Sequence, residues 1–584
     1  MRLHSFQLRT YAFAQGLAFC FFLIPLTELH GQSAPQAAWT ITGTNVSFLD
    51  HATDQRGNIY TTGFYRGSTT IGVTALAAPD NAMGASYFFV SKLNSAGVVQ
   101  WVSTEQTHIL NQTNDSLECA GSALALDSAG NVYVLGYLTS TEILINGLTL
   151  RNSRADGTAD MFLMKYTPDG SFLWVKQFQG DGDDRPVTLA TSHNQLYAGG
   201  YYASTKLLIG SDTLKNSAVD GSNDMWLAAF DYDGNVKWTR SYGGANGEDE
   251  VNALAVDVSG NLHLTADAGS STCIIEGHPI KNTGGDVIFT ALFSPAGALQ
   301  WIATANDGSF GQSTGIGVDH AGNTIVLGEF QGRAIKFGNS VVTNTDQTTL
   351  PQNLVVIRYD QNGNPVSAMG GGTSAPDSVG VYPIDCKVDS AGSVYIIGGF
   401  PSAALKISNH SVVNPTLSGT ALFAIKLGVD NSFDWSFVGS GVGENVCTSI
   451  DMNRDSSVNI TAVFTGSGFA LDGVSIANQG IGTGFVSHLQ FKRAGVAMNS
   501  EPDIAAALFP NPFSTMAELD IAKSSLKGRL VIRIYDVLGR VVRSYEQSDQ
   551  KSLVFERAGL SSGAYRIVLA DEHGQLVTLS AVIE

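Results

Sequence analysis

A sevenfold internal repeat constrains this chain more than any other feature of its sequence. The clearest copy reads Asp257-Val-Ser-Gly-Asn261, and near-copies of this turn, followed by strand-forming residues, recur along most of the chain. The residue two places after the turn asparagine marks each copy, with spacings of 62 to 73 residues: Tyr60, Tyr133, Tyr197, His263, Ile325, Tyr395 and Asn459. Such a period indicates stacked copies of one supersecondary unit.

Each unit predicts four short strands. Apolar runs flank the Asp-x-x-Gly-Asn turn, and a second pair of runs flanks a turn such as Pro168-Asp-Gly170. Gly and Asn tolerate the positive φ of a tight turn, so both pairs are typical of β-hairpins. Four strands cannot bury both faces of a small sheet alone. We therefore predict an all-β fold in which seven such sheets pack in a ring, a seven-bladed β-propeller.

The tryptophans predict how the ring closes. Five of them stand four residues after the second turn, at Trp101, Trp174, Trp238, Trp301 and Trp435. The seventh unit lacks its tryptophan strand, whereas Trp39-Thr-Ile-Thr42 precedes the first unit. We expect this N-terminal strand to complete the last blade.

Residues 1–31 are typical of a signal peptide, because Arg2 and Arg9 precede an apolar run that ends near small residues. No later segment is apolar enough to cross a membrane, so the mature chain should have no transmembrane segment. Of the cysteines that remain, Cys119, Cys273, Cys386 and Cys447, none forms a Cys-x-x-Cys pair. Buried thiols are the favoured interpretation, and one long-range disulfide is the alternative.

The charge excludes some partners. Residues 1–31 contribute +1 and residues 505–584 contribute zero to the net charge of −19, so the repeat region carries −20. Such a field repels phosphate, which argues against nucleic acid and anionic membranes as partners. Cationic ligands, divalent ions and neutral sugars stay open.

Acidic residues gather in the segments that join one blade to the next. In a propeller these segments share one face with the loops between the two hairpins of each blade. The acids are solvated loop residues or a low-priority set of ligands for Ca²⁺ or another molecule, because Ca²⁺ takes several oxygen ligands. They are Asp181, Asp183, Asp184, Glu248, Asp249, Glu250, Asp307 and Glu444.

The repeat resembles a known family. Gly243-Gly-Ala-Asn-Gly-Glu-Asp249, continued by Asp257-Val-Ser-Gly-Asn261, is similar to the bacterial seven-bladed β-propeller (SBBP) repeat over about Trp39 to Met498. The resemblance implies a propeller outside the cytoplasm and implies no activity. It departs from the pattern in the third unit and in the seventh, where the turn is Arg454-Asp-Ser-Ser457.

A second resemblance lies at the C-terminus. Leu508-Phe-Pro-Asn-Pro-Phe-Ser514, Ile532-Arg-Ile-Tyr535 and Leu560-Ser-Ser-Gly563 look like the type A C-terminal sorting domain of the type IX secretion system of Bacteroidota. The alternating strands of this region favour a small immunoglobulin-like β-sandwich. The resemblance implies recognition by the type IX machinery. An ordinary adhesion module is the alternative.

Together these patterns predict four parts: a signal peptide (1–31), a propeller (32–498), a linker (499–507) and a sorting domain (508–584). Nucleophile, zinc-protease and P-loop motifs are absent except for Gly311-Gln-Ser313-Thr-Gly315, which has no helix pattern after it. We expect a secreted or surface-displayed monomer, without a cofactor or catalytic residue, that binds carbohydrate or a surface protein. The alternative is a hydrolase or lyase with its site on the acidic loop face.

Overall fold

The structure is a computed structural model. It describes residues 35–79, 85–109, 118–154, 156–192, 194–218, 220–282, 284–305, 310–373, 380–416, 419–471, 474–478, 480–491, 507–509, 514–520, 529–535, 541–548, 552–571 and 576–583. The chain divides into two compact units, one up to Phe491 and one from Lys492 onward. The predicted signal peptide and residue Asp307 lie outside the described residues.

Sets of four antiparallel strands build the first unit, and the described residues contain seven of them. The first strands of the sets are β2 (Val46–Thr53), β9 (Cys119–Leu126), β15 (Asp184–Thr191), β21 (Asp249–Val256), β27 (Phe310–Val318), β33 (Tyr382–Val388) and β39 (Asn445–Met452). The second strands are β3 (Ile59–Arg66), β10 (Val132–Leu138), β16 (Leu196–Tyr202), β22 (Leu262–Ala268), β28 (Thr324–Gln331), β34 (Val394–Phe400) and β40 (Val458–Phe464).

The third strands are β6 (Ser86–Leu93), β13 (Asp160–Tyr166), β19 (Asp224–Phe230), β25 (Val287–Phe293), β31 (Asn353–Tyr359), β37 (Ala421–Leu427) and β43 (Thr483–Gln490). The fourth strands are β7 (Val99–Thr104), β14 (Phe172–Gln179), β20 (Val236–Tyr242), β26 (Leu299–Thr304), β32 (Pro365–Thr373), β38 (Phe433–Gly441) and β1 (Gln36–Thr44). We number the sets as blades 1 to 7 in the order of their first strands.

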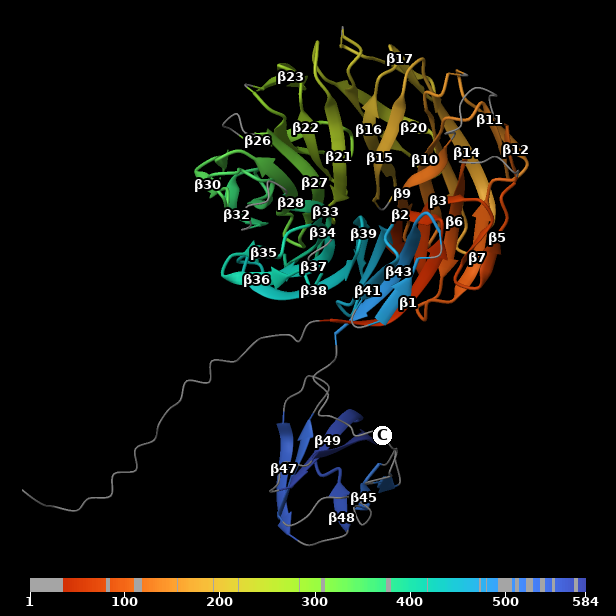
Figure 1. The fold of residues 1–584 in the computed structure, drawn as a ribbon. Coiled ribbons are helices and arrows are strands. Elements are labelled where there is room, and N and C mark those ends of the chain that lie inside the picture. The colour runs from red at the N-terminus through yellow and green to blue at the C-terminus, as the bar shows by residue number, and fades with distance from the viewer. Residues whose placement is uncertain are drawn as a thin grey trace, which may run out of the picture. The chain divides into compact units, whose positions relative to one another are not determined.

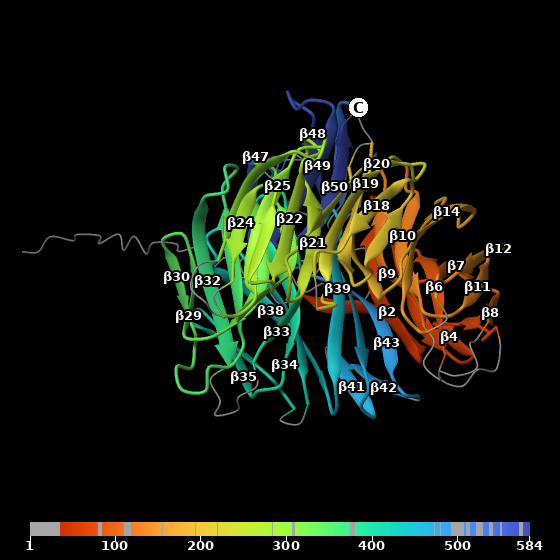
Figure 2. The ribbon, with the colours of Figure 1, turned by 90° about the horizontal axis from the view of Figure 1, so that it is seen from above.

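The seven first strands surround a common axis. Each contacts the first strand of the next blade, and β39 of blade 7 contacts β2 of blade 1, so the ring is closed (Figure 1). Figure 2 shows the same sheets from above. Third strands such as β13, β19 and β25 are buried at every residue, because neighbouring blades cover both faces of each sheet.

The N-terminal strand β1 belongs to the last blade. It pairs antiparallel with β43, with Trp39 opposite His488 and Thr42 opposite Phe485. The two segments lie side by side although more than 400 residues separate them in sequence (Figure 1). This strand therefore ties the start of the described chain to the end of the ring.

Fourth-strand tryptophans join each blade to the following one. The indole N–H of Trp101 donates to the Pro168 carbonyl in the next blade, and those of Trp39, Trp238 and Trp301 donate to Ser95, Pro295 and Gln361. A glycine in each accepting turn lets the indole ring of the tryptophan pack directly on the turn backbone. A Cβ added at Gly170 would stand 2.6 Å from the Trp101 ring.

A small hairpin between the second and third strands makes a further connection between blades. Its strand β17 pairs with β14 of the preceding blade, and β35 and β41 pair with β32 and β38 in the same way. The hairpins are β4 (Thr69–Ile71) with β5 (Thr74–Leu76), β11 (Glu142–Ile145) with β12 (Leu148–Arg151), β17 (Lys206–Ile209) with β18 (Asp212–Lys215), β23 (Thr272–Ile275) with β24 (His278–Lys281), β29 (Ala334–Phe337) with β30 (Ser340–Thr343), β35 (Ala404–Ile407) with β36 (His410–Val413) and β41 (Gly468–Leu471) with β42 (Val474–Ala477). The short strand β8 (Thr107–Ile109) pairs with β11.

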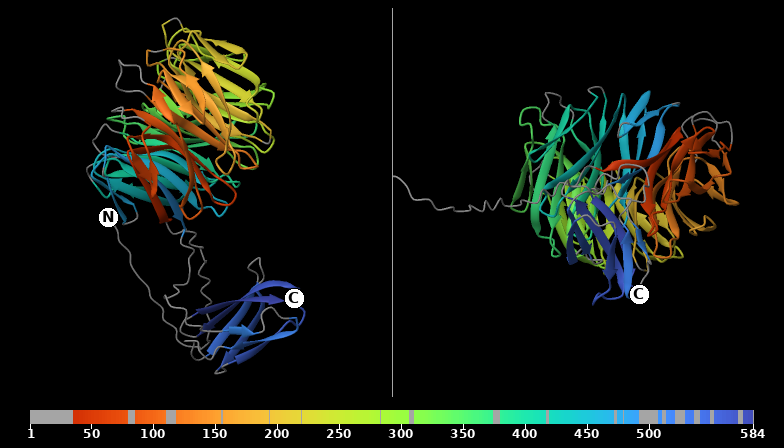
Figure 3. Two further views of the ribbon diagram at one scale, coloured as in Figure 1. Left: turned by 90° about the vertical axis from the view of Figure 1, so that its right-hand side faces the viewer. Right: turned by 90° about the horizontal axis from the view of Figure 1, so that it is seen from below.

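The second unit is a two-sheet sandwich, drawn in blue in Figure 3. One sheet contains β44 (Ala507–Phe509), β45 (Met516–Asp520) and β48 (Ser552–Glu556). The other contains β47 (Val541–Ser548), β46 (Arg529–Tyr535), β49 (Gly563–Asp571) and β50 (Leu576–Ile583). Leu519 and Phe555 of the first sheet pack with Ile532, Ile567 and Leu569 of the second in one apolar core.

Two other observations concern the sequence predictions. Cys119, Cys273, Cys386 and Cys447 are free, buried thiols. Within the described residues, no helix has the length and apolar character needed to span a bilayer.

Candidate functional site

The ring has two ends with different chemistry. At the end that we call the turn face, the first strands finish and the Asp-x-x-Gly-Asn turns lie. At the other end, the loop face, the first strands begin. A residue type repeated at the same position of every blade serves the fold, whereas positions that hold unlike residues are free of that role.

On the turn face the repeated aspartates hold their own turns. The Asp127 carboxylate accepts N–H bonds from Ala129 and Asn131, both at 2.9 Å, and a bond from the Asn131 side chain at 2.8 Å. Its second oxygen also accepts the Tyr133 hydroxyl at 3.0 Å. Asp54, Asp257, Asp319 and Asp389 cap their turns in a similar way. These carboxylates are occupied by turn formation.

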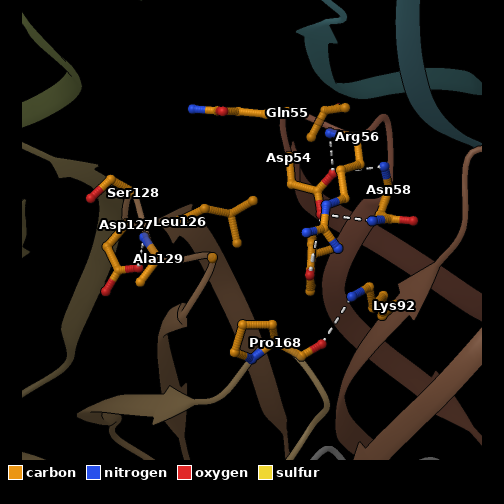
Figure 4. Close-up of a pocket in the computed structure, with 13 residues that line it drawn as sticks. Asp54, Gln55, Arg56, Asn58, Lys92, Leu126, Asp127, Ser128, Ala129 and Pro168 are labelled. Atoms are coloured by element: carbon orange, nitrogen blue, oxygen red, sulfur yellow. Dashed lines mark hydrogen bonds between the residues drawn. The ribbon is translucent and has the colours of Figure 1, made fainter.

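A cleft of about 550 Å³ opens on the turn face between blades 1 and 2 (Figure 4). Lys92 lies across it, with its ammonium 4.8 Å from the centre of the Tyr60 ring and 3.0 Å from the Pro168 carbonyl. Between blades 2 and 3, Tyr232 occupies the position of Pro168 and stacks on Tyr133 at 5.6 Å. The cleft is thus a gap between repeat turns that a smaller residue leaves open.

Most of the predicted loop acids bind backbone groups. Asp184 accepts the N–H of Ser204 at 3.1 Å and its hydroxyl at 2.7 Å, and Asp249 makes the equivalent bonds to Ser270. Asp181 accepts the N–H and hydroxyl of Thr205, both at 2.6 Å. Because Asp184 and Asp249 are buried, their pKa values rise to about 7 and about 6. These three acids therefore brace the loops.

The other predicted acids differ in their surroundings. Asp183 accepts the Ala159 N–H and pairs with Arg185 at 3.1 Å. The Glu248 carboxylate accepts the N–H of Asn223 at 2.9 Å, and Glu444 is exposed. Half-buried Glu250 makes no side-chain hydrogen bond to a described residue, and burial, followed by the charge of Glu248, raises its pKa. In the part of the chain that is described, no three His, Cys, Asp or Glu side chains are placed to hold a metal ion.

One ring of positions on the loop face carries unlike residues. We call it the entry ring: a residue of each first strand and the residue opposite it on the second strand. The pairs, from blade 1 to blade 7, are Ser47–Phe64, Ala120–Tyr137, Arg185–Tyr201, Glu250–Asp267, Gln312–Glu329, Tyr382–Gly399 and Val446–Val463.

Sequence reasoning missed most of the entry ring. Only Glu250 was among the predicted site residues, since an aromatic residue inside a strand looks like a core residue. Asp267, the second-strand residue of the entry ring in blade 4, is buried and accepts bonds from Asn252 and from Ser313 of the next blade, so it joins blades 4 and 5. The serine of the Gly-x-Ser-x-Gly string is thereby a structural donor.

Comparison with known proteins identifies the second unit. Residues 507–584 match the family described as secretion system C-terminal sorting domain. The second unit is a type IX sorting domain. It indicates export by type IX secretion to the cell surface or into the medium, as predicted.

The rest of the chain has weaker relatives. A stretch of 339 residues is 24% identical to an uncharacterized WD repeat-containing protein of Acanthamoeba polyphaga mimivirus, and the alignment covers 49% of this chain. It covers 24% of the relative, so this chain spans about a quarter of that protein. The resemblance to the SBBP repeat stays a prediction.

Solved structures with similar folds are also distant. A fungal alcohol oxidase of the AA5 family is 10% identical with a TM-score of 0.36, and coverage is 94% of this chain and 100% of the oxidase. The lignostilbene dioxygenase of Pseudomonas brassicacearum is 9% identical with a TM-score of 0.28. The match covers 79% of this chain and 91% of the dioxygenase. An extracellular domain of a putative hybrid two component system of B. thetaiotaomicron is 10% identical with a TM-score of 0.17. The match covers 93% of this chain and 98% of that domain. The propeller is defined by the strand order of the chain itself.

Proposed function

We propose that the propeller is a non-enzymatic binding scaffold that type IX secretion delivers to the outside of the cell, and that it binds its ligand at the entry ring. The observation that supports this is the variety of the ring. Equivalent positions hold aromatic, cationic, anionic, amide and aliphatic side chains, whereas the turn face repeats Asp, Tyr and Lys. Ligand sites commonly combine apolar surface with a few convergent polar groups.

The variety of side chains at the entry ring indicates that the fold does not determine which residue stands at each position. Strands pair in the same register at all seven entry-ring pairs although no two pairs have the same residues. The sheet register therefore demands no particular side chain there, although Asp267 also joins blades 4 and 5. Those positions are consequently open to selection for binding.

We also propose the limits of the domains. The signal peptide would comprise residues 1–31, the propeller 32–498 and the linker 499–507, with the sorting domain from residue 508. The family match from residue 507 and the division of the chain after Phe491 support this order.

A hydrolase or lyase is the second candidate. Burial raises the pKa of Glu329 to about 7, which suits a general acid near neutral pH. Glu329 belongs to the entry ring and accepts a bond from Gln352 at 3.0 Å. Replacing Glu329 with Gln would abolish turnover if this candidate is correct, and the absence of turnover in the wild type would contradict the candidate.

The test of the proposed function compares three forms of the full chain on one array of glycans and extracellular proteins. They are the wild type, a loop-face variant (Tyr201→Ala with Gln312→Ala) and a turn-face control (Gln55→Ala with Arg56→Ala, both exposed in the cleft of Figure 4). We expect wild-type signals to be lost in the loop-face variant and kept in the control. Equal binding by all three forms, or loss in the control alone, would contradict the proposal.

A further inference from the structure

Six side chains on blades 1 to 3 form a connected band at the entry ring, which we call the aromatic arc: Phe64, Arg66, Glu118, Tyr137, Arg185 and Tyr201. The band begins in blade 1, where the Arg66 guanidinium lies 5.5 Å from the centre of the Phe64 ring. Arg66 donates to the Ser86 hydroxyl at 3.0 Å, and a β-bridge joins Ser86 to Glu118. The arc thus passes from blade 1 to the start of blade 2.

The band continues across blades 2 and 3. The Tyr137 hydroxyl donates to the Glu118 carboxylate at 2.9 Å. The guanidinium of Arg185, from blade 3, stacks 4.2 Å above the Tyr137 ring, and Arg185 is itself opposite Tyr201 in the sheet. Flat aromatic or guanidinium groups therefore lie on each of three consecutive blades.

These aromatic rings are not needed for the core. Phe64, Tyr137 and Tyr201 are each partly exposed, whereas the next residue along each strand is fully buried. Blades 6 and 7 have Gly399 and Val463 at the same position, and their strands pair in the same way. The rings consequently offer apolar area to a ligand at little expense to stability.

The local charge favours a neutral ligand. Arg185 pairs with Asp183 at 3.1 Å, and the Glu118 carboxylate accepts the Tyr137 hydroxyl. Arg66 and Arg185 lie in the arc itself and repel a cation. Glu248 and Glu250, whose charges act on Tyr201, repel an anion. The field of −20 over the repeat region also opposes anions.

The chemistry that remains is flat, uncharged and rich in hydrogen-bonding groups. Guanidinium and carboxylate groups supply planar sets of donors and acceptors that match neighbouring hydroxyls, and aromatic rings pack against the C–H faces of a sugar ring. We propose that the aromatic arc binds a neutral oligosaccharide, with sugar rings on Tyr137 and Tyr201 and hydroxyls bonded to Arg185 and Glu118. This inference rests on the proposed function and specifies its ligand.

Calorimetric titration of the full chain with cellohexaose, xylohexaose, mannohexaose and chitohexaose tests it, with hexagalacturonate as the anionic comparison. We expect at least one neutral hexasaccharide to bind. Tyr137→Ala and Tyr201→Ala should each weaken that binding about fivefold, since a lost aromatic stack is worth on the order of 1 kcal/mol. Gln55→Ala, at an exposed position on the turn face, should leave affinity unchanged.

A second pair of variants keeps the test valid if an alanine variant unfolds. Tyr137→Phe retains the ring and should bind nearly as well as the wild type, whereas Arg185→Lys retains the charge, loses the flat stack and should bind several times more weakly. The proposal is overturned if no neutral hexasaccharide binds, if hexagalacturonate alone binds, or if the arc variants bind like the wild type. If the array signal still depends on the loop face while no neutral sugar binds, the ligand class is wrong and the binding role stands.

Discussion

Replacing Trp39 by Ala should destabilise the closed ring measurably, because this tryptophan joins the N-terminal strand to blade 1. Its indole N–H donates to the Ser95 carbonyl at 3.1 Å, and its ring stacks on His488 with the centroids 5.7 Å apart. It also covers the turn at Gly97, where an added Cβ would stand 2.7 Å from the ring.

The expected magnitude follows from these contacts. Removing a fully buried tryptophan costs about 3–5 kcal/mol, and Trp39 is only partly buried, so we expect about 2–3 kcal/mol including the lost hydrogen bond. For a unit of this size, unfolding entropy is on the order of 1 kcal/mol per degree, so the melting temperature should fall by about 2–3 °C. Trp39→Phe, which loses the donor and keeps a ring, should show about a third of this effect.

All seven tryptophans precede Phe491, so their fluorescence follows the unfolding of the propeller separately from that of the sorting domain. The melting curve of the full chain is therefore recorded by tryptophan fluorescence. Ala38→Ser, at an exposed position of the same strand, is the matched control and should change stability by less than about 0.5 kcal/mol. A Trp39→Ala melting temperature equal to that of the control would refute closure by this strand.

Three further outcomes are expected. Removing residues 508–584 should leave the product in the periplasm, and surface delivery of the truncated chain, seen by fractionation and blotting, would contradict a sorting role. Gly170→Ala should destabilise the propeller by about 1–3 kcal/mol, since φ at Gly170 is +89° and the new Cβ meets the Trp101 ring. Urea denaturation measures this loss, and an unchanged midpoint would exclude such crowding. Burial raises the pKa values of Asp184 and Glu329 to about 7, above those of the unfolded chain. The folded state therefore holds protons more tightly, and the free energy of unfolding should fall as pH rises from 5 to 8. Thermal melting across this range checks the prediction, and a stability that rises with pH would contradict it.

Much of the first unit follows from local residue patterns. The Asp-x-x-Gly-Asn turns and the hairpins around them depend on residues close together in sequence, and the structure places Asp127 in that role. The docking tryptophans were readable because they recur at one repeat position, although Trp101 contacts Pro168, 67 residues away. A hairpin register is determined by its turn, so such features are readable one unit at a time. The sorting domain was readable for the same reason, as three short motifs in order.

The sequence by itself thus determined the repeating unit, the turns of that unit and the sorting domain at residues 507–584. Tertiary structure alone decided which loop carboxylates bind backbone groups and which side chains remain partly exposed. Asp184 and Asp249 resemble ligands in sequence, yet each is buried against a loop from another part of its blade. Phe64, Tyr137 and Tyr201 resemble core residues, yet they occupy the same position on three neighbouring blades and lie partly in solvent, with Arg185 reaching back over Tyr137. Contacts between blades join residues tens of positions apart, and no local pattern in the chain encodes which partner each side chain will meet.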